Sequence, residues 1–121
     1  MATAKTILIV EDDGDFAESL STALTLKMHS VEIASTGFEA LDKVQQKTFD
    51  ICVLDIKMPG MSGLECLAKI KPLLPENTRY IIMTGFRDSE TLQQAAQSAA
   101  EQVLLKPFSI FEFLRLVETT N

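Results

Sequence analysis

Apolar runs and amphipathic segments alternate along the whole chain. Apolar runs of five or six residues predict β-strands, and they span residues 5–10, 30–34, 50–55, 79–84 and 102–106. The second run alternates polar and apolar residues, which indicates a strand near an edge of a sheet, whereas the others are almost continuous. Each run precedes a segment in which apolar residues recur every three or four positions, as in a helix packed on one face.

Strand and helix therefore repeat five times, which is typical of a parallel sheet covered by helices on both faces. Pro72 and Pro75 end the third predicted helix, and Ser109 with Glu112 forms the pattern of a capping box at the start of the last one. Four predicted helices have a clear inward apolar face. We expect this face to carry Phe16, Leu20, Ala23, Leu24 and Met28 in the first helix and Ala40, Leu41 and Val44 in the second. In the third helix it carries Leu67 and Ile70, and in the last helix Ile110, Phe113, Leu114 and Val117.

The remaining helix, predicted over residues 88–98, has a weaker apolar face than the others. It is rich in alanine and glutamine, and the core receives only Leu92, Ala95, Ala96 and Ala99 from this part of the chain. Because few large apolar groups hold it, we expect this helix to be the most weakly anchored.

Length, charge and cysteine usage narrow the function classes. We expect the 121 residues to form one domain with a core over about residues 5–119. The net charge of −6 argues against binding to nucleic acid or to an anionic membrane. Cys52 and Cys66 lack metal-ligand spacing, and no secretory signal or membrane-length apolar run is present, so we expect a cytoplasmic protein with Cys52 buried. His29, near a helix end, is expected to be solvated or favoured by the helix dipole.

Polar residues follow four of the predicted strands at the point where each strand ends. They are the acidic run 11–13, Asp55, Thr84 and Lys106. Crossovers between parallel strands are right-handed, so the carboxyl ends of these strands meet at one rim, where such sheets bind ligands. Taken singly, each residue has a plainer explanation: an acidic helix start, an ordinary strand-end threonine, or a solvated lysine. Their convergence on one rim favours a site.

The residue types at this rim suit magnesium and phosphate. Three neighbouring carboxylates need a cation, and Asp12 and Asp55, with Glu11 acting through water, are ligands that suit Mg²⁺ rather than zinc. A carboxylate beside Mg²⁺ can attack phosphorus and form an aspartyl-phosphate. Lys106 would neutralise charge on the phosphoryl oxygens, and the hydroxyl of Thr84 would bind one of them. The site therefore predicts phosphoryl acceptance on Asp55.

Four motifs give the chain a resemblance to a known family. They are Ile-Leu-Ile-Val-Glu-Asp-Asp at 7–13, Val-Leu-Asp-Ile-Lys-Met-Pro-Gly-Met-Ser-Gly-Leu-Glu at 53–65, Ile-Ile-Met-Thr-Gly at 81–85 and Leu-Lys-Pro-Phe at 105–108. In this order and at these separations, the chain resembles the response-regulator receiver domain of two-component signalling over nearly its whole length. The resemblance implies an α/β, flavodoxin-like (βα)5 fold, with a doubly wound, five-stranded parallel sheet in the order 2-1-3-4-5.

The resemblance also implies a role for each site residue. Asp55 is the phosphoacceptor, Glu11 and Asp12 with the backbone carbonyl of Lys57 bind Mg²⁺ or Mn²⁺, Thr84 is the switch hydroxyl and Lys106 binds the phosphate. The family often has a cis peptide before the proline of this motif, so the bond between Lys106 and Pro107 is expected to be cis. Such a domain is a phosphoacceptor switch and not an enzyme.

Five positions depart from the family pattern or vary within it. Val103 stands where many relatives have an aromatic ring that reports the switch, and Gly85 stands where alanine is common, which could open the phosphate to water or to a phosphatase. Lys57 and Phe86 occupy the variable positions that influence phosphoryl lifetime. Phe111 is expected to be an exposed aromatic residue on the last helix, unless it and Val103 serve routine packing.

The implied function is a signalling switch. A histidine kinase or histidine phosphotransfer protein would phosphorylate Asp55, and the surface of the fourth helix, fifth strand and fifth helix would change. The sequence holds no output domain, so we expect it to control a partner protein or an output domain of a longer protein, with phosphorylation-dependent homodimers as a further expectation.

Two other classes fit the sequence less well. A metal-dependent aspartyl-phosphate hydrolase usually has a second acid two residues after the nucleophile, where this chain has Lys57, and it usually has a cap domain. A flavin-binding domain of similar topology needs a phosphate-cradling loop after the first strand, where this chain has the acidic run 11–13.

Overall fold

A five-stranded parallel sheet forms the centre of the molecule. The computed structural model describes residues 4–85 and 102–119. The strands are β1 (Thr6–Val10), β2 (Ser30–Ala34), β3 (Ile51–Asp55), β4 (Arg79–Thr84) and β5 (Gln102–Leu105). They lie in the order β2-β1-β3-β4-β5, and every neighbouring pair is parallel. This arrangement confirms the predicted doubly wound sheet and the edge position of β2.

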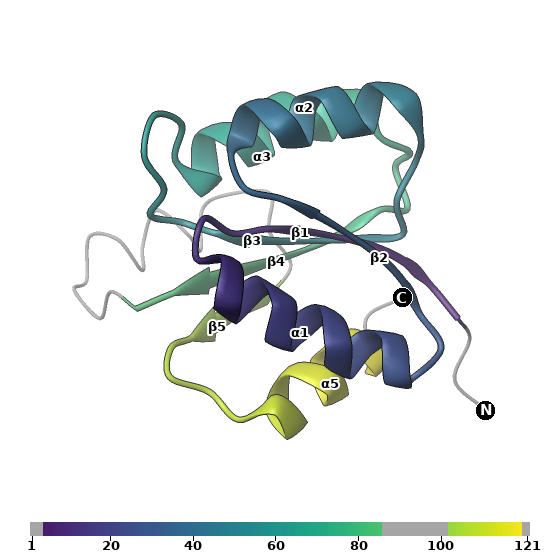
Figure 1. Ribbon diagram of the computed structural model, residues 1–121. Helices are drawn as coiled ribbons and strands as arrows, with labels where there is room; N and C mark the ends of the chain where they lie inside the picture. Colours follow the sequence, from purple (N-terminus) through teal and green to yellow (C-terminus); the bar gives the residue numbers. More distant parts are fainter. Residues whose placement is uncertain (1–3, 86–101, 120–121) are drawn as a thin grey trace.

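Helices cover both faces of the sheet. They are α1 (Gly14–Leu26), α2 (Gly37–Gln46), α3 (Gly63–Ile70), the 3₁₀ turn η1 (Lys71–Leu73) and α5 (Ile110–Thr119). Figure 1 shows α2 and α3 together on one face and α1 with α5 on the other. The helix predicted over 88–98 lies outside the described residues. No helix in the two described ranges combines the length and hydrophobicity needed to cross a membrane.

Side-chain caps explain where the helices begin. The side chains of Asp13 and Thr36 accept hydrogen bonds from the first turns of α1 and α2, and Ser62 forms a reciprocal capping box with Glu65 at α3. The capping box predicted at α5 is also present: the Glu112 N–H donates to Ser109 Oγ at 3.1 Å, and the Ser109 N–H donates to Glu112 Oε1 at 3.4 Å. Each such cap stabilises its helix by about 1 kcal/mol.

Side chains alternate between two core layers along the strands. The layer under α2 and α3 includes Leu8, Val10, Cys52, Leu54, Tyr80 and Ile82, and the layer under α1 and α5 includes Ile7, Ile9, Val53, Ile81, Phe113 and Val117. Cys52 is buried as predicted, and Cys66 is buried in the same layer. Burial raises the pKa of both thiols, that of Cys66 to about 11, so both stay protonated at neutral pH.

The inward position predicted for Met28 is wrong. Helix α1 ends at Leu26, and Met28 has a φ of 72° and a side chain that is 80% exposed. The chain turns there because the N–H groups of Lys27 and His29 both donate to the carbonyl of Leu24, which is a left-handed helix end formed without glycine. The buried positions on this helix are Ala17, Leu20 and Leu24.

The solvated position predicted for His29 is also wrong. Its side chain is buried, and its Nδ1 accepts a hydrogen bond of 3.0 Å from the backbone N–H of Lys5. Its Nε2 has no hydrogen-bond partner among the residues that the structure describes. Burial lowers the pKa of the imidazole, the nearby charge of Lys5 lowers it further, and Glu118 partly offsets both effects.

This burial predicts a pH-dependent stability. The pKa of His29 is lower in the folded chain than its ordinary value of 6.5, so the unfolded chain binds more protons as the pH falls through that value. The free energy of unfolding of the wild type should therefore decrease, relative to that of His29→Gln, between pH 7.5 and 5. Urea unfolding of both proteins at several pH values measures this difference. Parallel curves for the two proteins would show that His29 is protonated equally in both states.

Candidate phosphoacceptor and metal site

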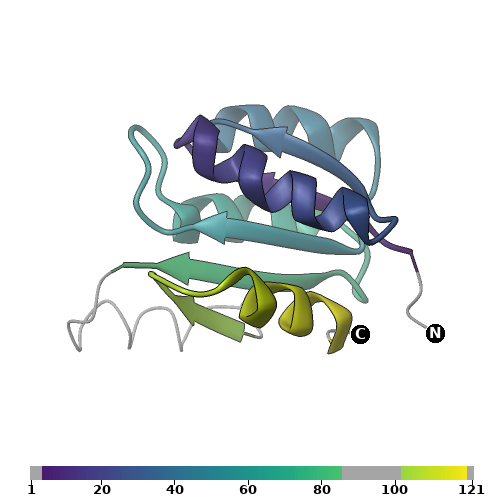
Figure 2. The ribbon, with the colours of Figure 1, turned by 60° about the horizontal axis from the view of Figure 1, so that its bottom comes forward.

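The strand ends bring the predicted site residues to one rim of the sheet. Asp55 is the last residue of β3 and Thr84 is the last residue of β4, while Glu11 and Lys106 directly follow β1 and β5. Figure 2 shows the arrowheads of β3, β4 and β5 pointing the same way, toward this rim. The convergence follows from the parallel topology, because every strand ends on the same side.

Three carboxylates form a close cluster at this rim. Glu11, Asp12 and Asp55 each offer an oxygen atom, and these atoms all lie within 4.8 Å of one another. Glu11 is 1% exposed and Asp55 is also buried, whereas Asp12 is exposed to solvent. Asp13 points away from the cluster, because its carboxylate accepts a hydrogen bond of 3.1 Å from the N–H of Phe16 and caps α1. The structure therefore separates Asp13 from the other three acids.

Burial makes the two inner carboxylates difficult to ionise. Burial raises the pKa of Glu11 to about 7. A hydrogen bond from Lys106 opposes this shift, and the charge of Asp55 adds to it. Burial also raises the pKa of Asp55, although the charge of Lys106 acts against it. Two crowded acids with raised pKa values are a local excess of negative charge that a bound cation would relieve.

Lys106 already supplies one positive charge to the cluster. Its Nζ donates a hydrogen bond of 2.9 Å to Glu11 Oε1 and lies 3.5 Å from Asp55 Oδ1. Burial alone would lower the pKa of Lys106, but the hydrogen bond to Glu11 and the charge of Asp55 outweigh it, so the pKa is raised and the lysine stays charged. The peptide bond between Lys106 and Pro107 is cis, as predicted.

An aromatic row supports Lys106, and sequence reasoning missed its connection to the site. The lysine Nζ lies 4.6 Å from the ring centroid of Phe16, which is within the range of a cation–π contact. The ring centroids of Phe16 and Phe108 lie 5.8 Å apart in an edge-to-face contact, and those of Phe108 and Phe113 lie 6.0 Å apart in a stacked arrangement. The helical pattern identified Phe16 and Phe113 only as inward-facing residues, and Phe108 belongs to the Leu-Lys-Pro-Phe motif.

The donor set of the cluster fits Mg²⁺ or Mn²⁺. All three residues offer carboxylate oxygens, and hard divalent cations prefer oxygen ligands with several retained waters. Within the cluster that the structure describes, histidine and cysteine are absent, which is unlike a zinc site. Glu11, Asp12 and Asp55 would hold the ion. The contribution of the Lys57 carbonyl stays a prediction, and the Lys57 side chain is exposed.

Thr84 lies beside these residues and is linked to Lys106 through the backbone. Its side chain is buried, and its carbonyl accepts a hydrogen bond of 2.7 Å from the N–H of Lys106. Gly85 follows it at the surface, and an added Cβ there would meet no atom of the described residues within 4 Å. Phe86, which was predicted to flank the site, lies outside the described residues.

The backbone behind Asp55 is packed unusually tightly against α3. A Cβ atom added to Gly63 would lie 2.7 Å from the carbonyl carbon of Asp55 and 2.9 Å from the Cα of Ile56, and it would also collide with the Asp55 carbonyl oxygen. The N–H of Gly63 donates a hydrogen bond of 2.7 Å to the carbonyl of Ile56. Only glycine therefore fits at the start of α3, and this contact positions the backbone of Asp55.

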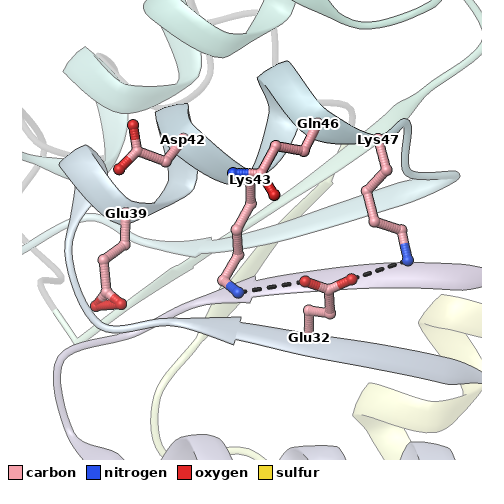
Figure 3. Close-up of a pocket in the computed structure, with 6 residues that line it drawn as sticks. All are labelled: Glu32, Glu39, Asp42, Lys43, Gln46 and Lys47. Carbon is pink, nitrogen blue, oxygen red and sulfur yellow. Dashed lines mark hydrogen bonds and ion pairs between the residues drawn. The ribbon is translucent and has the colours of Figure 1, made fainter.

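The described surface has hollows that lie apart from the acidic cluster, and two of them adjoin the edge strands. One, of about 400 Å³, lies between α2 and the edge strand β2, where Lys43 and Lys47 both pair with Glu32 (Figure 3). The other, of about 320 Å³, lies between β5 and α5 and includes Val103, which is 37% exposed. Phe111 is 79% exposed on α5, which confirms the expectation of an exposed aromatic residue rather than routine packing.

Comparison with known proteins identifies the family. A family model described as the response regulator receiver domain matches residues 7–118 of the chain. The chain belongs to this family. The receiver domain of two-component response regulators is phosphorylated on an aspartate, acts as a phosphoacceptor switch, binds Mg²⁺ at its acidic pocket, and has histidine kinases or phosphotransfer proteins as partners. The family does not favour the hydrolase alternative.

Curated relatives include both short and long proteins. Sporulation initiation phosphotransferase F of Bacillus subtilis (strain 168) is 35% identical over 106 residues, which cover 88% of this chain and 85% of that protein. The DNA-binding transcriptional regulator NtrC of Klebsiella pneumoniae is 41% identical over 91% of this chain, but the match covers only 23% of that regulator. This receiver thus spans about a quarter of the length of NtrC and of ZraR from Klebsiella oxytoca, of which it covers 24%.

Solved structures of receiver domains have the same fold. A CheY-like receiver domain protein from Methanospirillum hungatei JF-1 has a TM-score of 0.87 and 31% identity, and the match covers 95% of this chain and 91% of that chain. A Burkholderia pseudomallei response regulator, solved with a phosphorylated aspartic acid, a calcium ion and citrate, has a TM-score of 0.85 and 28% identity, and the match covers 95% of this chain and 67% of that chain.

Proposed function

We propose that this receiver accepts a phosphoryl group on Asp55 from the phosphohistidine of a histidine kinase or phosphotransfer protein, in a step that requires Mg²⁺, in the cytoplasm. The observation that carries the proposal is the contact set around Asp55. Its carboxylate shares a 4.8 Å cluster with Glu11 and Asp12, and it lies 3.5 Å from the Nζ of Lys106. A nucleophile, a metal-binding pair and a cation are the groups that phosphoryl transfer to a carboxylate requires.

The transfer can be written in terms of this chain's residues. An oxygen of Asp55 attacks the phosphorus atom, the phosphorus–nitrogen bond of the phosphohistidine breaks, and its electron pair returns to the imidazole ring. Lys106 lies close enough to Asp55 to neutralise charge on the transferred oxygens, and the Thr84 hydroxyl donates to one of them. Mg²⁺ held by Glu11, Asp12 and the Lys57 carbonyl would add positive charge at the same oxygens.

A route from the phosphate to the surface begins at Lys106. In the unphosphorylated chain this lysine binds Glu11, so a phosphoryl group on Asp55 would compete for the same ammonium group. The Lys106 N–H binds the Thr84 carbonyl, which couples the ends of β4 and β5. Movement of these two residues would change β5 and α5, where Val103 and Phe111 are exposed.

The proposed output is a change in protein contacts. The surface would comprise β5, α5 and the helix predicted over 88–98, with Gly85 and Phe86 at its border with the site. It would act on a partner protein, on an output domain or on a second copy of the receiver. Because Val103 replaces the aromatic residue of many relatives, side-chain rotation at that position does not carry the signal in this chain.

A direct test is phosphorylation by a small donor. Incubation with acetyl phosphate and MgCl₂ should add one phosphoryl group to the intact protein, as measured by mass spectrometry. Excess EDTA should reduce the modified fraction about a hundredfold or more, because the crowded carboxylates then lack a cation. Equal modification with and without EDTA would contradict the metal requirement, and no modification in MgCl₂ would contradict phosphoryl acceptance itself.

A further inference from the structure

The ammonium group of Lys106 contacts an aromatic ring as well as two carboxylates. Its Nζ lies over the ring of Phe16, 4.6 Å from the centroid, and it is at the same time 2.9 Å from Glu11 Oε1 and 3.5 Å from Asp55 Oδ1. The face of an aromatic ring carries partial negative charge and attracts a cation. The ring therefore holds the lysine without occupying a carboxylate oxygen that a metal ion could use.

Lys106 is a side chain that needs such a restraint. Lysine carries its charge on a flexible four-carbon stem, and the side chain of Lys106 is 27% exposed, so its ammonium group could also point into solvent. Ion pairs at partly exposed positions are weak. A metal ion bound by Glu11 would also compete with Lys106 for that carboxylate, whereas it would leave the contact with Phe16 in place.

Two further rings fix the position of the Phe16 ring. Phe16 is the third residue of α1, and its ring meets that of Phe108 edge to face, at an interplanar angle of 66°. Phe108 in turn stacks on Phe113 of α5, which is completely buried. Helices α1 and α5 lie on the same face of the sheet (Figure 1). The ring that contacts Lys106 is thus anchored in the core and is not a freely moving surface side chain.

We propose that Phe16 is a positioning residue for phosphoryl transfer, whose ring holds the ammonium group of Lys106 beside Asp55 through a cation–π contact. The inference rests on the proposed phosphorylation of Asp55 and adds to it a residue that acts through Lys106. Because the lysine is already ordered before the transfer, less of its freedom is lost when charge develops on the phosphoryl oxygens. An aliphatic side chain of similar volume would fill the space but would not attract the ammonium group.

Fluorination of this ring tests the contact with little change in shape. Phe16 is replaced by 4-fluoro-, 3,5-difluoro- and 3,4,5-trifluorophenylalanine through suppression of a stop codon, and each added fluorine withdraws negative charge from the face of the ring. The initial rate of phosphorylation by acetyl phosphate in MgCl₂, measured by mass spectrometry, should fall with each fluorine. From phenylalanine to the trifluoro analogue we expect a decrease of about threefold.

Phe49 provides the matched control for fluorination. Its ring also lies near a lysine, with the Nζ of Lys47 at 5.5 Å from the centroid, but it precedes β3, and Asp55 ends that strand. The same three analogues at Phe49 should leave the phosphorylation rate unchanged. Among natural residues, Phe16→Leu should lower the rate about as much as the trifluoro analogue does, and Phe16→Tyr should keep a rate near that of the wild type because it retains the aromatic face.

A second measurement tests the contact in the unphosphorylated protein. Protons above an aromatic ring are shifted upfield by the ring current, so the ε-methylene protons of Lys106 should resonate upfield of those of the exposed Lys57. Their signal is assigned by its loss in Lys106→Met. In Phe16→Leu the upfield shift should disappear, whereas in Phe16→Tyr it should remain.

Two results would overturn the positioning role of Phe16. One is a wild type that is phosphorylated at a rate that the number of fluorines at Phe16 does not change. The other is a set of Lys106 proton shifts that are the same in the wild type and in Phe16→Leu. A wild type that acquires no phosphoryl group is a different result, because it contradicts phosphoryl acceptance on Asp55 and thereby removes the reaction in which Phe16 would act.

Discussion

Asp55→Asn should remain unmodified after incubation with acetyl phosphate and MgCl₂, under conditions that add one phosphoryl group to the wild type. Asparagine keeps the shape of the side chain but has no anionic oxygen to attack phosphorus. Its fold should be retained, because the substitution removes one charge from a buried cluster in which burial raises the pKa of both Asp55 and Glu11, and in which the charge of Asp55 further raises the pKa of Glu11. We therefore expect a free energy of unfolding at pH 7 that is at least that of the wild type.

A second acid at the same rim provides the matched control. Asp13 directly follows the metal pair in the sequence, but its carboxylate caps α1 and does not belong to the cluster. Asp13→Asn makes the same change in charge and keeps a good helix cap, so it should be modified to nearly the wild-type extent. Mass spectrometry of the three proteins tests both expectations. A phosphoryl group on Asp55→Asn, or its loss from Asp13→Asn, would contradict the assignment of Asp55.

Gly63→Ala should destabilise the domain by about 3 kcal/mol, which is a large effect for the addition of one methyl group. The new Cβ would lie 2.7 Å from the carbonyl carbon of Asp55 and 2.9 Å from the Cα of Ile56. These are backbone atoms of a buried strand end, so they cannot move aside as a flexible side chain could. Any relaxation must shift Asp55 itself, and phosphorylation by acetyl phosphate should therefore slow as well.

Two other glycines occupy the equivalent position in their helices. Gly14, Gly37 and Gly63 are each the first residue of a helix and follow Asp13, Thr36 and Ser62 as capping residues. Among the described residues, a Cβ at Gly14 meets nothing within 4 Å, and the three nearest atoms to one at Gly37 all belong to the side chain of Met61.

The three alanine variants should therefore differ in stability. Gly14→Ala should stabilise the domain by about 0.5 kcal/mol, since alanine restricts the unfolded chain, and Gly37→Ala should fall between the other two. Urea unfolding followed by circular dichroism measures all three. Equal stability of the three variants would show that the contact behind Asp55 relaxes freely.

The strands and the acidic site were predictable because their signals are local and physical. Each buried strand is a run of apolar residues, and each site residue directly follows such a run, so the parallel topology alone assembles Glu11, Asp55 and Lys106. Adjacent residues on an extended chain point to opposite sides, but the sequence does not say which of the two points inward. It therefore could not show that Glu11 is buried while Asp12 is exposed. That difference decides which acid binds Lys106.

The wrong predictions for Met28 and His29 share one cause: the burial of each side chain depends on local backbone geometry or on contacts with residues that are distant in the sequence. Met28 continues the helical spacing of α1, yet the chain leaves the helix at Leu26. His29 is buried because the Lys5 N–H, 24 residues away, donates to it. The close approach of Gly63 to Asp55 depends on packing between elements, for which the sequence carries no periodic signal.

The buried thiols of Cys52 and Cys66 allow the rate of local opening of the folded domain to be measured from the rate of their alkylation. A thiol reagent attacks only an accessible thiolate, and both Cys52 of β3 and Cys66 of α3 are buried in the core layer between the sheet and helices α2 and α3, with raised pKa values. In the native protein, alkylation therefore proceeds only as fast as the structure around β3 and α3 separates. Since β3 ends at Asp55, the labelling half-time measures how often the phosphoacceptor strand is released, at constant pH and without denaturant.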